Sequence, residues 1–342
     1  MYPLEGIKQP TIEDNWRGII LYGRNSQSYK FALAKSLLEM RPAEGDLIRL
    51  EDIAPIYAGH LTDHLKTSDK QGTAPSSKFL DICRSFNEGS TTEAQLVKKT
   101  IELGFKNVID AFHRVYQNDV PFRFFENERK TNGGIRITTN FSLLADRPQF
   151  EDLTKEAEAR WRLVETSWEL KLSRALITVH HDSEFELLFA LDGKRRRKNV
   201  TSSRDALNGY QLGYCFYCFD HIHLDQGKES FPEVDHFFPH TLKQSGFGSI
   251  IDGIWNLVLA CKECNRGAGG KFTAVPTERL LARLNTRNEF LIGSNHPLKE
   301  TLMRQTGILK ADRKVFLKNF YNDVWASLLH RWEPVEKGEV RF

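Results

Sequence analysis

FPEVDHFFPH occupies residues 231–240 of the chain, and WNLVLACKECN occupies residues 255–265. The first stretch places an acid directly beside a histidine, Asp235 and His236, within a run of apolar and aromatic residues. The second stretch has an asparagine, Asn256, ahead of apolar residues typical of a buried strand, and it runs into a Cys-x-x-Cys pattern. The organisation of this half of the chain depends on what holds these polar residues in place.

The chain has five cysteines, and four of them form two Cys-x-x-Cys pairs. We expect a reducing compartment, in which such pairs indicate a metal site rather than disulfides. Each pair can present two thiolates to one tetrahedral ion, and the ion would then tie together the ends of the folded insert between the pairs. The sequence therefore predicts a closed, structural zinc site, with the ligands Cys215, Cys218, Cys261 and Cys264.

Two other interpretations of the cysteine pairs are a redox centre and a set of buried free thiols. A redox Cys-x-x-Cys normally opens a helix in a thioredoxin-like βαβ pattern, and neither pair has such a pattern around it. The fifth cysteine, Cys83, stands alone in a helical pattern, so we expect it to be a small buried side chain.

Three motifs occur in order around the cysteine pairs: VDHFFPH at 234–240, WNLVLAC at 255–261 and CNRG at 264–267. In this order they resemble the HNH nuclease motif, in the zinc-ribbon form of the ββα-metal fold. The HNH domain of the RNA-guided CRISPR nucleases is similar, with an Asp-His, an Asn and an Asn-Arg-Gly but without the cysteines. The resemblance covers roughly residues 203–275 and implies a metal-dependent endonuclease that hydrolyses phosphodiester bonds of DNA.

The residue types of the motifs suit that chemistry. Phosphodiester hydrolysis needs a nucleophilic water, a base that takes its proton, and positive charge near the phosphate and the leaving oxygen. Histidine titrates near neutral pH, so His236 is suited to be the base. Asp235 precedes it on the predicted strand, and its side chain is expected on the opposite side of the backbone unless the strand bends.

The resemblance implies a role for each polar residue of the motifs. Asp235 and Asn265 would be the ligands of one divalent ion, Mg²⁺ or Mn²⁺, which prefer hard oxygen donors. His236 would be the general base, and Asn256 would brace the loop and orient the histidine without contacting the ion. Asparagine replaces histidine at the third motif position, which favours Mg²⁺ over softer ions. Asn265 follows Cys264 directly, so the zinc would also position a ligand of the catalytic ion.

Basic residues near the motifs are candidates for binding phosphate. Two clusters contribute: the residues that follow the motifs, and the run KRRRK at 194–198, which a phosphate backbone would neutralise. A solvated face or loop explains each cluster equally well. The candidate nucleic-acid-binding residues are Arg266, Lys271, His240, Lys194, Arg195, Arg196 and Arg197.

The composition agrees with a globular protein but does not select a function. Of the 342 residues, 40% are hydrophobic and 27% are charged, and the formal net charge is +3. This mild excess of positive charge permits binding to nucleic acid without arguing for it. No apolar run is long enough to span a bilayer, and the N-terminus lacks the pattern of a signal peptide. We therefore expect a cytoplasmic protein that does not associate with membranes.

The fold class expected is α+β: a mainly helical protein with an embedded ββα-metal HNH unit that a four-cysteine zinc site holds together. Residues 1–190 would form a mostly helical domain, which docks a partner protein or restrains the nuclease, as in the effector subunit of a bacterial defence system. Residues 191–202 would be a basic linker, 203–275 the nuclease domain, and 276–342 helices packed on it. The alternatives are a non-catalytic zinc-ribbon module that binds nucleic acid, and an HNH nuclease that cuts RNA.

Local patterns predict the secondary structure around this unit. The expected helices cover residues 26–40, 51–65, 78–86, 91–104, 106–117, 150–175, 277–291, 296–307 and 311–332. The expected strands cover residues 17–23, 122–125, 135–141, 178–181 and 185–191.

Overall fold

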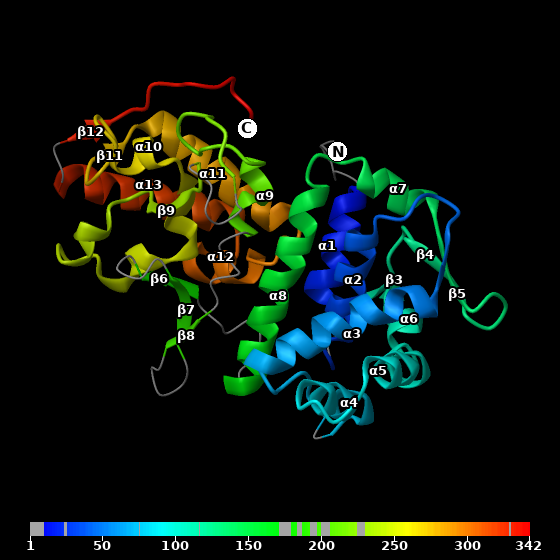
Figure 1. Cartoon of the computed structure of the whole chain (residues 1–342). Helices are drawn as coiled ribbons and strands as arrows, with labels where there is room; N and C mark the ends of the chain where they lie inside the picture. Colours follow the sequence, from blue (N-terminus) through cyan, green and yellow to red (C-terminus); the bar gives the residue numbers. More distant parts are fainter. Residues whose placement is uncertain are drawn as a thin grey trace. The chain divides into compact units, whose positions relative to one another are not determined.

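The structure is a computed structural model, which describes residues 10–23, 26–74, 76–115, 117–170, 179–182, 187–191, 197–199, 206–223, 230–327 and 330–342. Within these residues the chain combines many helices with five small sheets of two or three strands, which agrees with the expected α+β class (Figure 1). None of the described helices is long and apolar enough to cross a membrane.

The chain divides into two compact units, Met1–Ala157 and Glu158–Phe342. The division falls within the long helix α8 (Phe150–Leu170), and not near residue 190, where the sequence suggested a boundary. The residues expected to form a basic linker also contribute to a sheet, because Arg197–Asn199 is strand β8 and pairs with β7. The helical pattern runs across this boundary without a break, and the charged loop lies well after it. Neither feature therefore located the boundary.

The first unit is mainly helical, with a three-stranded antiparallel sheet of order β1-β5-β4 and a short hairpin, β2-β3. Its helices are α1 (Ile12–Tyr22), α2 (Tyr29–Met40), α3 (Leu50–Thr67), α4 (Lys78–Asn87), α5 (Glu93–Lys99), α6 (Val108–Ala111) and α7 (Thr139–Ala145). Its strands are β1 (Leu47–Arg49), β2 (Arg114–Val115), β3 (Asn118–Asp119), β4 (Phe125–Glu128) and β5 (Gly134–Ile137).

Four local predictions in the first unit are wrong. The strand predicted over 122–125 lies further along the chain, because β4 begins only at Phe125. Residues 17–22 are helical and not a strand, because the capping box of Thr11 and Asp14 starts α1 ahead of them. Residues 106–117 form only the short helix α6 before the chain turns into β2. The strand predicted over 135–141 ends at Ile137, and α7 begins at Thr139.

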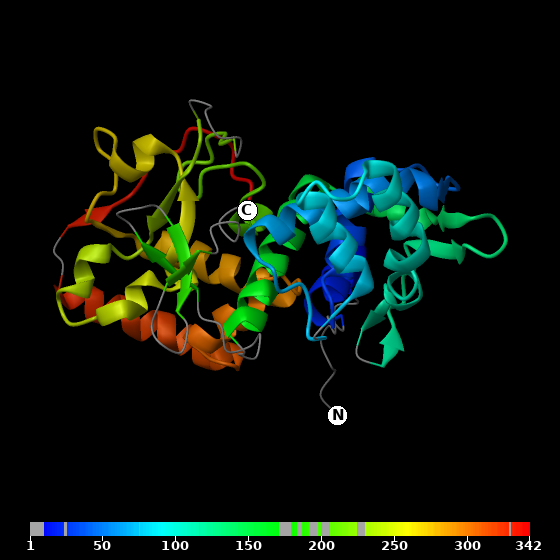
Figure 2. The same cartoon turned by 60° about the horizontal axis from the view of Figure 1, so that its bottom comes forward.

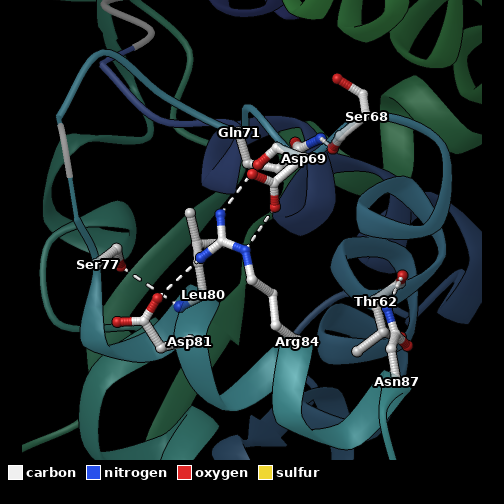
Figure 3. Close-up of polar contacts among 9 residues, drawn as sticks. All are labelled: Thr62, Ser68, Asp69, Gln71, Ser77, Leu80, Asp81, Arg84 and Asn87. Atoms are coloured by element: carbon white, nitrogen blue, oxygen red, sulfur yellow. Dashed lines mark hydrogen bonds and ion pairs between the residues drawn. The ribbon is translucent and has the colours of Figure 1, made fainter.

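The loop between α3 and α4 is held by side-chain contacts, as Figure 3 shows. The guanidinium of Arg84 on α4 donates to Asp69 Oδ1 at 2.6 Å and to Asp81 Oδ1 at 2.8 Å. Ser77 caps α4 by accepting from the Leu80 N–H at 3.4 Å, and Asn87 donates to the Thr62 carbonyl at 2.8 Å. The bonds of Asp69 and Ser77 fasten the loop to α4, and the bond of Asn87 joins α4 to α3.

The second unit combines a three-stranded sheet with short two-stranded pairings and helices. Its strands are β6 (Val179–Asp182), β7 (Leu187–Leu191), β8 (Arg197–Asn199), β9 (Glu233–His236), β10 (Leu257–Ala260), β11 (Val275–Pro276) and β12 (Arg331–Trp332). Its helices, after the second part of α8, are α9 (Asn208–Gln211), α10 (Lys262–Arg266), α11 (Glu278–Gly293), α12 (Lys299–Thr306) and α13 (Lys310–Ser327).

Strands β9 and β10 form an antiparallel pair, and helices α11 to α13, coloured orange to red in Figure 2, gather beside it. Phe238, just after β9, packs edge-on against Phe320 of α13 with ring centroids 5.0 Å apart. Trp255, just before β10, packs against Phe316 of the same helix at 5.0 Å. The aromatic contacts therefore fix both ends of the hairpin loop on one helix.

The end of the chain departs from the prediction of one helix over 311–332. Helix α13 ends at Ser327, and Arg331–Trp332 is strand β12, which pairs in parallel with β11. The segment after β12 continues over the first cysteine pair, where the Lys337 and Gly338 N–H groups donate to the Cys218 carbonyl at 2.9 and 3.1 Å. A helical pattern in the sequence did not reveal this change of direction.

Candidate functional site

The hairpin β9-β10 places the two motif strands side by side. Asp235 pairs with Val258 and His236 with Leu257, and α10 follows β10 after a single residue, Cys261. The β10 side chains are fully buried, so the register is fixed by packing. A strand, a strand and a short helix thus carry the acid, the histidine and the second cysteine pair.

Four cysteine sulfurs lie together where the hairpin meets the first Cys-x-x-Cys. The Sγ atoms of Cys215, Cys218, Cys261 and Cys264 all lie within 4.8 Å of one another. Cys218 Sγ and Cys261 Sγ are 3.7 Å apart, close to the separation of about 3.8 Å that a tetrahedral ion with Zn–S bonds of about 2.3 Å imposes. The cluster could hold a metal ion such as zinc.

The surroundings of the cysteines suit thiolates bound to an ion. The four cysteines are free thiols, and burial raises the pKa of Cys215 well above its usual value. Backbone N–H groups point at the sulfurs, from Cys261 to Cys215 Sγ at 3.3 Å and from Cys264 to Cys261 Sγ at 3.5 Å. Buried thiols become thiolates readily only beside positive charge, which a bound cation supplies.

A cavity of about 280 Å³ opens next to the hairpin and collects six of the residues that the sequence singled out. Three of them are motif residues, and three are candidate phosphate-binding residues. Its lining consists of Val234, Asp235, His236, Pro239, His240, Asn265, Arg266, Lys271, Phe272 and Thr273. The three residues expected at the chemical centre, Asp235, His236 and Asn265, therefore open to one space.

The Asp235 carboxylate is buried and has a partner on each oxygen. The Tyr217 hydroxyl donates to Oδ2 at 2.6 Å, and the Lys271 ammonium lies 3.3 Å from Oδ1. Tyr217 lies between the two cysteines of the first pair, so the four-cysteine cluster holds this donor in place. Burial, and to a smaller extent the contact with Asp235, raises the pKa of Tyr217 well above its usual value.

Asn265 is oriented by an acid on the neighbouring strand. Its Nδ2 donates to Glu233 Oε2 at 2.8 Å, and Arg266 Nε donates to the other Glu233 oxygen at 2.8 Å. A carboxylate only accepts hydrogen bonds, so the amino group of Asn265 faces Glu233 and its carbonyl oxygen is left for another partner. The geometry presents Asn265 as an oxygen donor.

Asp252, an acid that the sequence did not single out, lies close to the His236 ring. Asp252 Oδ1 lies 3.6 Å from His236 Nε2, and Asp252 Oδ2 accepts from Lys243 Nζ at 2.5 Å. Burial alone would raise the pKa of Asp252, but contacts with His236 and Lys243 outweigh it and lower the pKa. A carboxylate beside Nε2 favours the tautomer with its proton on Nε2, which leaves the lone pair on Nδ1.

Asn256 is fully buried and clamps the chain directly after His236. Its Oδ1 accepts from the Phe238 N–H at 2.8 Å, while its Nδ2 donates to the Phe238 carbonyl at 3.0 Å and to the Ile251 carbonyl at 2.9 Å. Its backbone carbonyl accepts from the Phe237 N–H at 2.7 Å. Asn256 lies outside the residues that line the cavity, so its contribution is to brace the loop.

The clamp is supported from behind by α11. Arg287 on this helix is fully buried, and its guanidinium donates to the carbonyls of Ile254 and Leu257, on either side of Asn256. Burial lowers the pKa of Arg287 to about 9. Asn288 donates to the Trp255 carbonyl at 3.1 Å. The helices after the motifs thus fix the loop that positions His236.

For the predicted basic residues 194–197, the structure describes no side chain at this cavity. Lys194, Arg195 and Arg196 lie outside the described residues. Arg197 is the first residue of β8, and its side chain is also outside the description. Arg266 and Lys271 line the cavity together with His240.

Sequence reasoning missed three residues of the site: Tyr217, Glu233 and Asp252. The position of Tyr217 inside the first Cys-x-x-Cys was a usable signal, because a knuckle fixes the direction of its inner residues. Glu233 lies two residues before Asp235, on the same face of a strand. Asp252 had no signal, since only the fold of the loop brings it to His236.

Comparison of the chain with protein-family models, with curated proteins and with solved structures finds no match. The residues of this site are therefore the basis for a function of the chain.

Proposed function

We propose that the chain is a metal-dependent HNH endonuclease that hydrolyses phosphodiester bonds of DNA. One observation carries the proposal: Asp235, His236 and Asn265 open to a single cavity of about 280 Å³ beside a four-cysteine cluster. The order of β9, β10 and α10 supports a ββα-metal unit, and the cluster supports zinc as its structural ion.

The donor set fits a hard divalent cation. Asp235 and Asn265 would hold Mg²⁺ or Mn²⁺ through a carboxylate and a carboxamide oxygen, and Glu233 already turns the amide of Asn265 the right way. When bound, the ion supplies positive charge to the phosphate and to the departing oxygen. Lys271 is the cation that Asp235 faces at 3.3 Å, so it competes with the ion for the same carboxylate.

The chain's own residues would manage the proton. His236 accepts a proton from the attacking water at Nδ1, because Asp252 keeps the proton of the neutral ring on Nε2. Asn256 holds the turn after His236 and so keeps the ring in place. Arg266, Lys271 and His240 surround the cavity and would contact phosphate oxygens.

Plasmid cleavage tests the proposal. Supercoiled DNA is incubated with the full chain and Mg²⁺, beside His236→Ala, beside an EDTA control and beside His330→Ala, an exposed histidine remote from the motifs in sequence. We expect nicking by the wild type and by His330→Ala, and none by His236→Ala or with EDTA. DNA retained on a gel without nicking would instead indicate a zinc-ribbon binding module.

The same assay with an RNA of matched sequence separates a DNA nuclease from an RNA nuclease. We expect cleavage of DNA at a much higher rate than of RNA. The reverse preference would indicate that the same residues catalyse the cleavage of RNA.

A further inference from the structure

Phe272 is an exposed aromatic residue at the candidate catalytic cavity. Its side chain lines the cavity and is 57% exposed. Apart from the imidazoles of His236 and His240, it is the one aromatic ring among the residues that line this cavity. Single exposed apolar residues are common on protein surfaces, so the exposure alone needs no explanation.

The backbone at Phe272 has an unusual conformation. Its φ is +46°, in the left-handed region that bulky residues rarely adopt. The Phe272 N–H donates to the Asn265 carbonyl at 3.0 Å, and its carbonyl accepts from Lys271 Nζ at 3.2 Å. The two groups that fix this strained turn thus come from the candidate ligand asparagine and the cavity lysine.

Phe219 provides a comparison, because it has a similar φ of +61°. Its ring is only 1% exposed, and the Arg283 guanidinium lies over it at 4.1 Å. Packing therefore explains why an aromatic residue occupies that strained position. Phe272 has no such burial, and strain retained at an exposed position next to a site indicates a function.

The charges around Phe272 point to a nucleic acid as its partner. Lys271 is buried beneath it, and Arg266 and His240 are exposed on the same cavity. Glu233 and Asp235 are paired with Arg266 and Lys271, so the charges of each ion pair balance. An apolar ring beside basic N–H donors matches a base next to a phosphate, since every base offers a flat face to an aromatic side chain.

We propose that Phe272 is a stacking platform for one unpaired base of the DNA strand that enters the cavity. This inference rests on the proposed nuclease function and names its substrate class: DNA with an unpaired nucleotide beside the bond that is cut. A base inside a regular duplex has both faces covered by its neighbours, so it cannot stack on the ring without leaving the helix.

Photo-cross-linking tests the contact directly. The full chain carries His236→Ala so that DNA stays intact, and it is irradiated with a thymidine oligonucleotide that contains 5-iodouracil, a base that couples to stacked aromatic rings. We expect mass spectrometry to locate the adduct on Phe272, and we expect Phe272→Ala to lose it while Phe272→Tyr keeps it. Adducts that map elsewhere in all three proteins overturn the proposal.

Affinity measured in the same His236→Ala background separates stacking from general charge attraction. We expect Phe272→Ala to weaken binding to the single strand by about tenfold and binding to the matched duplex by less than about twofold. Leu309→Ala, which removes another exposed apolar side chain (64% exposed), should change neither. Equal losses on both DNAs, no loss on the single strand, or no DNA binding at all contradict the inference.

Thermal unfolding of Phe272→Gly checks that the ring is not a structural element. Glycine adopts a positive φ without strain, so we expect the melting temperature to stay the same or rise while the single-strand affinity falls as in Phe272→Ala. A clear drop in melting temperature in both variants would show that the ring stabilises the fold and would overturn the proposal.

The failure of the inference and the failure of the nuclease function have different signatures. If wild type and Phe272→Ala nick DNA equally and prefer the same substrates, the stacking proposal is wrong and the nuclease stands. If the wild type cross-links at Phe272 but never nicks DNA, the ring contact stands and the catalytic function is wrong.

Discussion

Asp235 lies between a neutral hydroxyl and a positive ammonium, and this pairing decides what the carboxylate can bind. Tyr217 fixes Oδ2 at 2.6 Å, and Lys271 balances the negative charge from 3.3 Å at Oδ1. Lys271 is only 1% exposed, so solvent screens it weakly. A divalent ion at Asp235 therefore meets a buried cation that has to move or be repelled.

Substitution of Lys271 tests this competition. We expect Lys271→Met to bind Mn²⁺ about tenfold more tightly without DNA, because the competing ammonium is gone, which corresponds to about 1.4 kcal/mol. We also expect slower DNA cleavage, since a phosphate contact is lost. Titration of Mn²⁺ followed by electron paramagnetic resonance measures the affinity.

Lys262→Met is the matched control for the Mn²⁺ titration, because Lys262 is exposed on α10, the helix that carries Asn265. It should bind Mn²⁺ like the wild type. Unchanged or weaker binding by Lys271→Met would show that the lysine does not oppose the ion.

Asp252 gives the fold a dependence on pH. Its folded pKa lies below the usual value, so it stabilises the fold above its ordinary pKa, and this stabilisation is lost as the pH falls through the folded value. We expect Asp252→Asn to lower the free energy of unfolding by about 1–3 kcal/mol at pH 7. The difference from the wild type should shrink below about pH 4.

Urea unfolding at a series of pH values measures this difference. Asp63→Asn serves as the control, because Asp63 forms only an exposed ion pair with Lys66 at 2.7 Å. A difference between wild type and Asp252→Asn that grows toward acid pH would contradict the assignment.

The stability of β9, β10 and α10 depends on the four-cysteine cluster, because these elements are short. Strands β9 and β10 have four residues each and α10 has five, too few for stability by themselves. The cluster joins Cys215 and Cys218 to Cys261, the N-cap of α10, and to Cys264 in the middle of that helix, and Tyr217 carries that constraint to Asp235. The metal would therefore support the catalytic geometry as well as the fold.

Removal of the metal tests this dependence. We expect a zinc chelator, or Cys261→Ser, to lower the melting temperature markedly and to abolish DNA cleavage even with excess Mg²⁺. Cys83→Ser is the matched control for thiol loss; it lies outside the cluster and should retain cleavage and bound zinc. Metal analysis should give one zinc per chain for the wild type and much less for Cys261→Ser. Full cleavage by the zinc-free protein would separate the cluster from the site.

We expect the two compact units of the molecule to have different roles. The residues argued to carry chemistry all lie after Glu158, in the second unit. The first unit has its own aromatic core, with Trp16 edge-on to Phe124 at 5.0 Å, and a buried ion pair of Arg17 with Glu156 at 2.7 Å. We propose that this unit docks a partner protein or restrains the nuclease, as in an effector of a bacterial defence system.

A comparison of DNA cleavage by the full chain and by residues 158–342 tests these roles. If the second unit folds alone, as circular dichroism and bound zinc would show, we expect it to cut DNA at a different rate from the full chain, or to lose a response to a partner. Equal rates under every condition would leave the first unit without a regulatory role.

Much of the site could be predicted from the sequence, because its strongest signals are local. Two Cys-x-x-Cys pairs predict a shared ion whatever the intervening chain does, and the order of Asp235, His236, Asn256 and Asn265 is visible without a structure. The secondary structure near residues 17–23 and 135–141 was predicted wrongly, because capping by Thr11 and burial of Phe141 outweighed the β-branched composition.

The sequence by itself determined which residues could act and which cysteines could share an ion, since these depend on residue type and short spacing. Only the tertiary structure decided which groups face them: Tyr217 and Lys271 at Asp235, Glu233 at Asn265, Asp252 at His236. These pairings depend on strand register and on loops packed by distant helices. Local patterns can place Tyr217 and Glu233 near the motifs, but only the packed fold brings each of these groups to its partner.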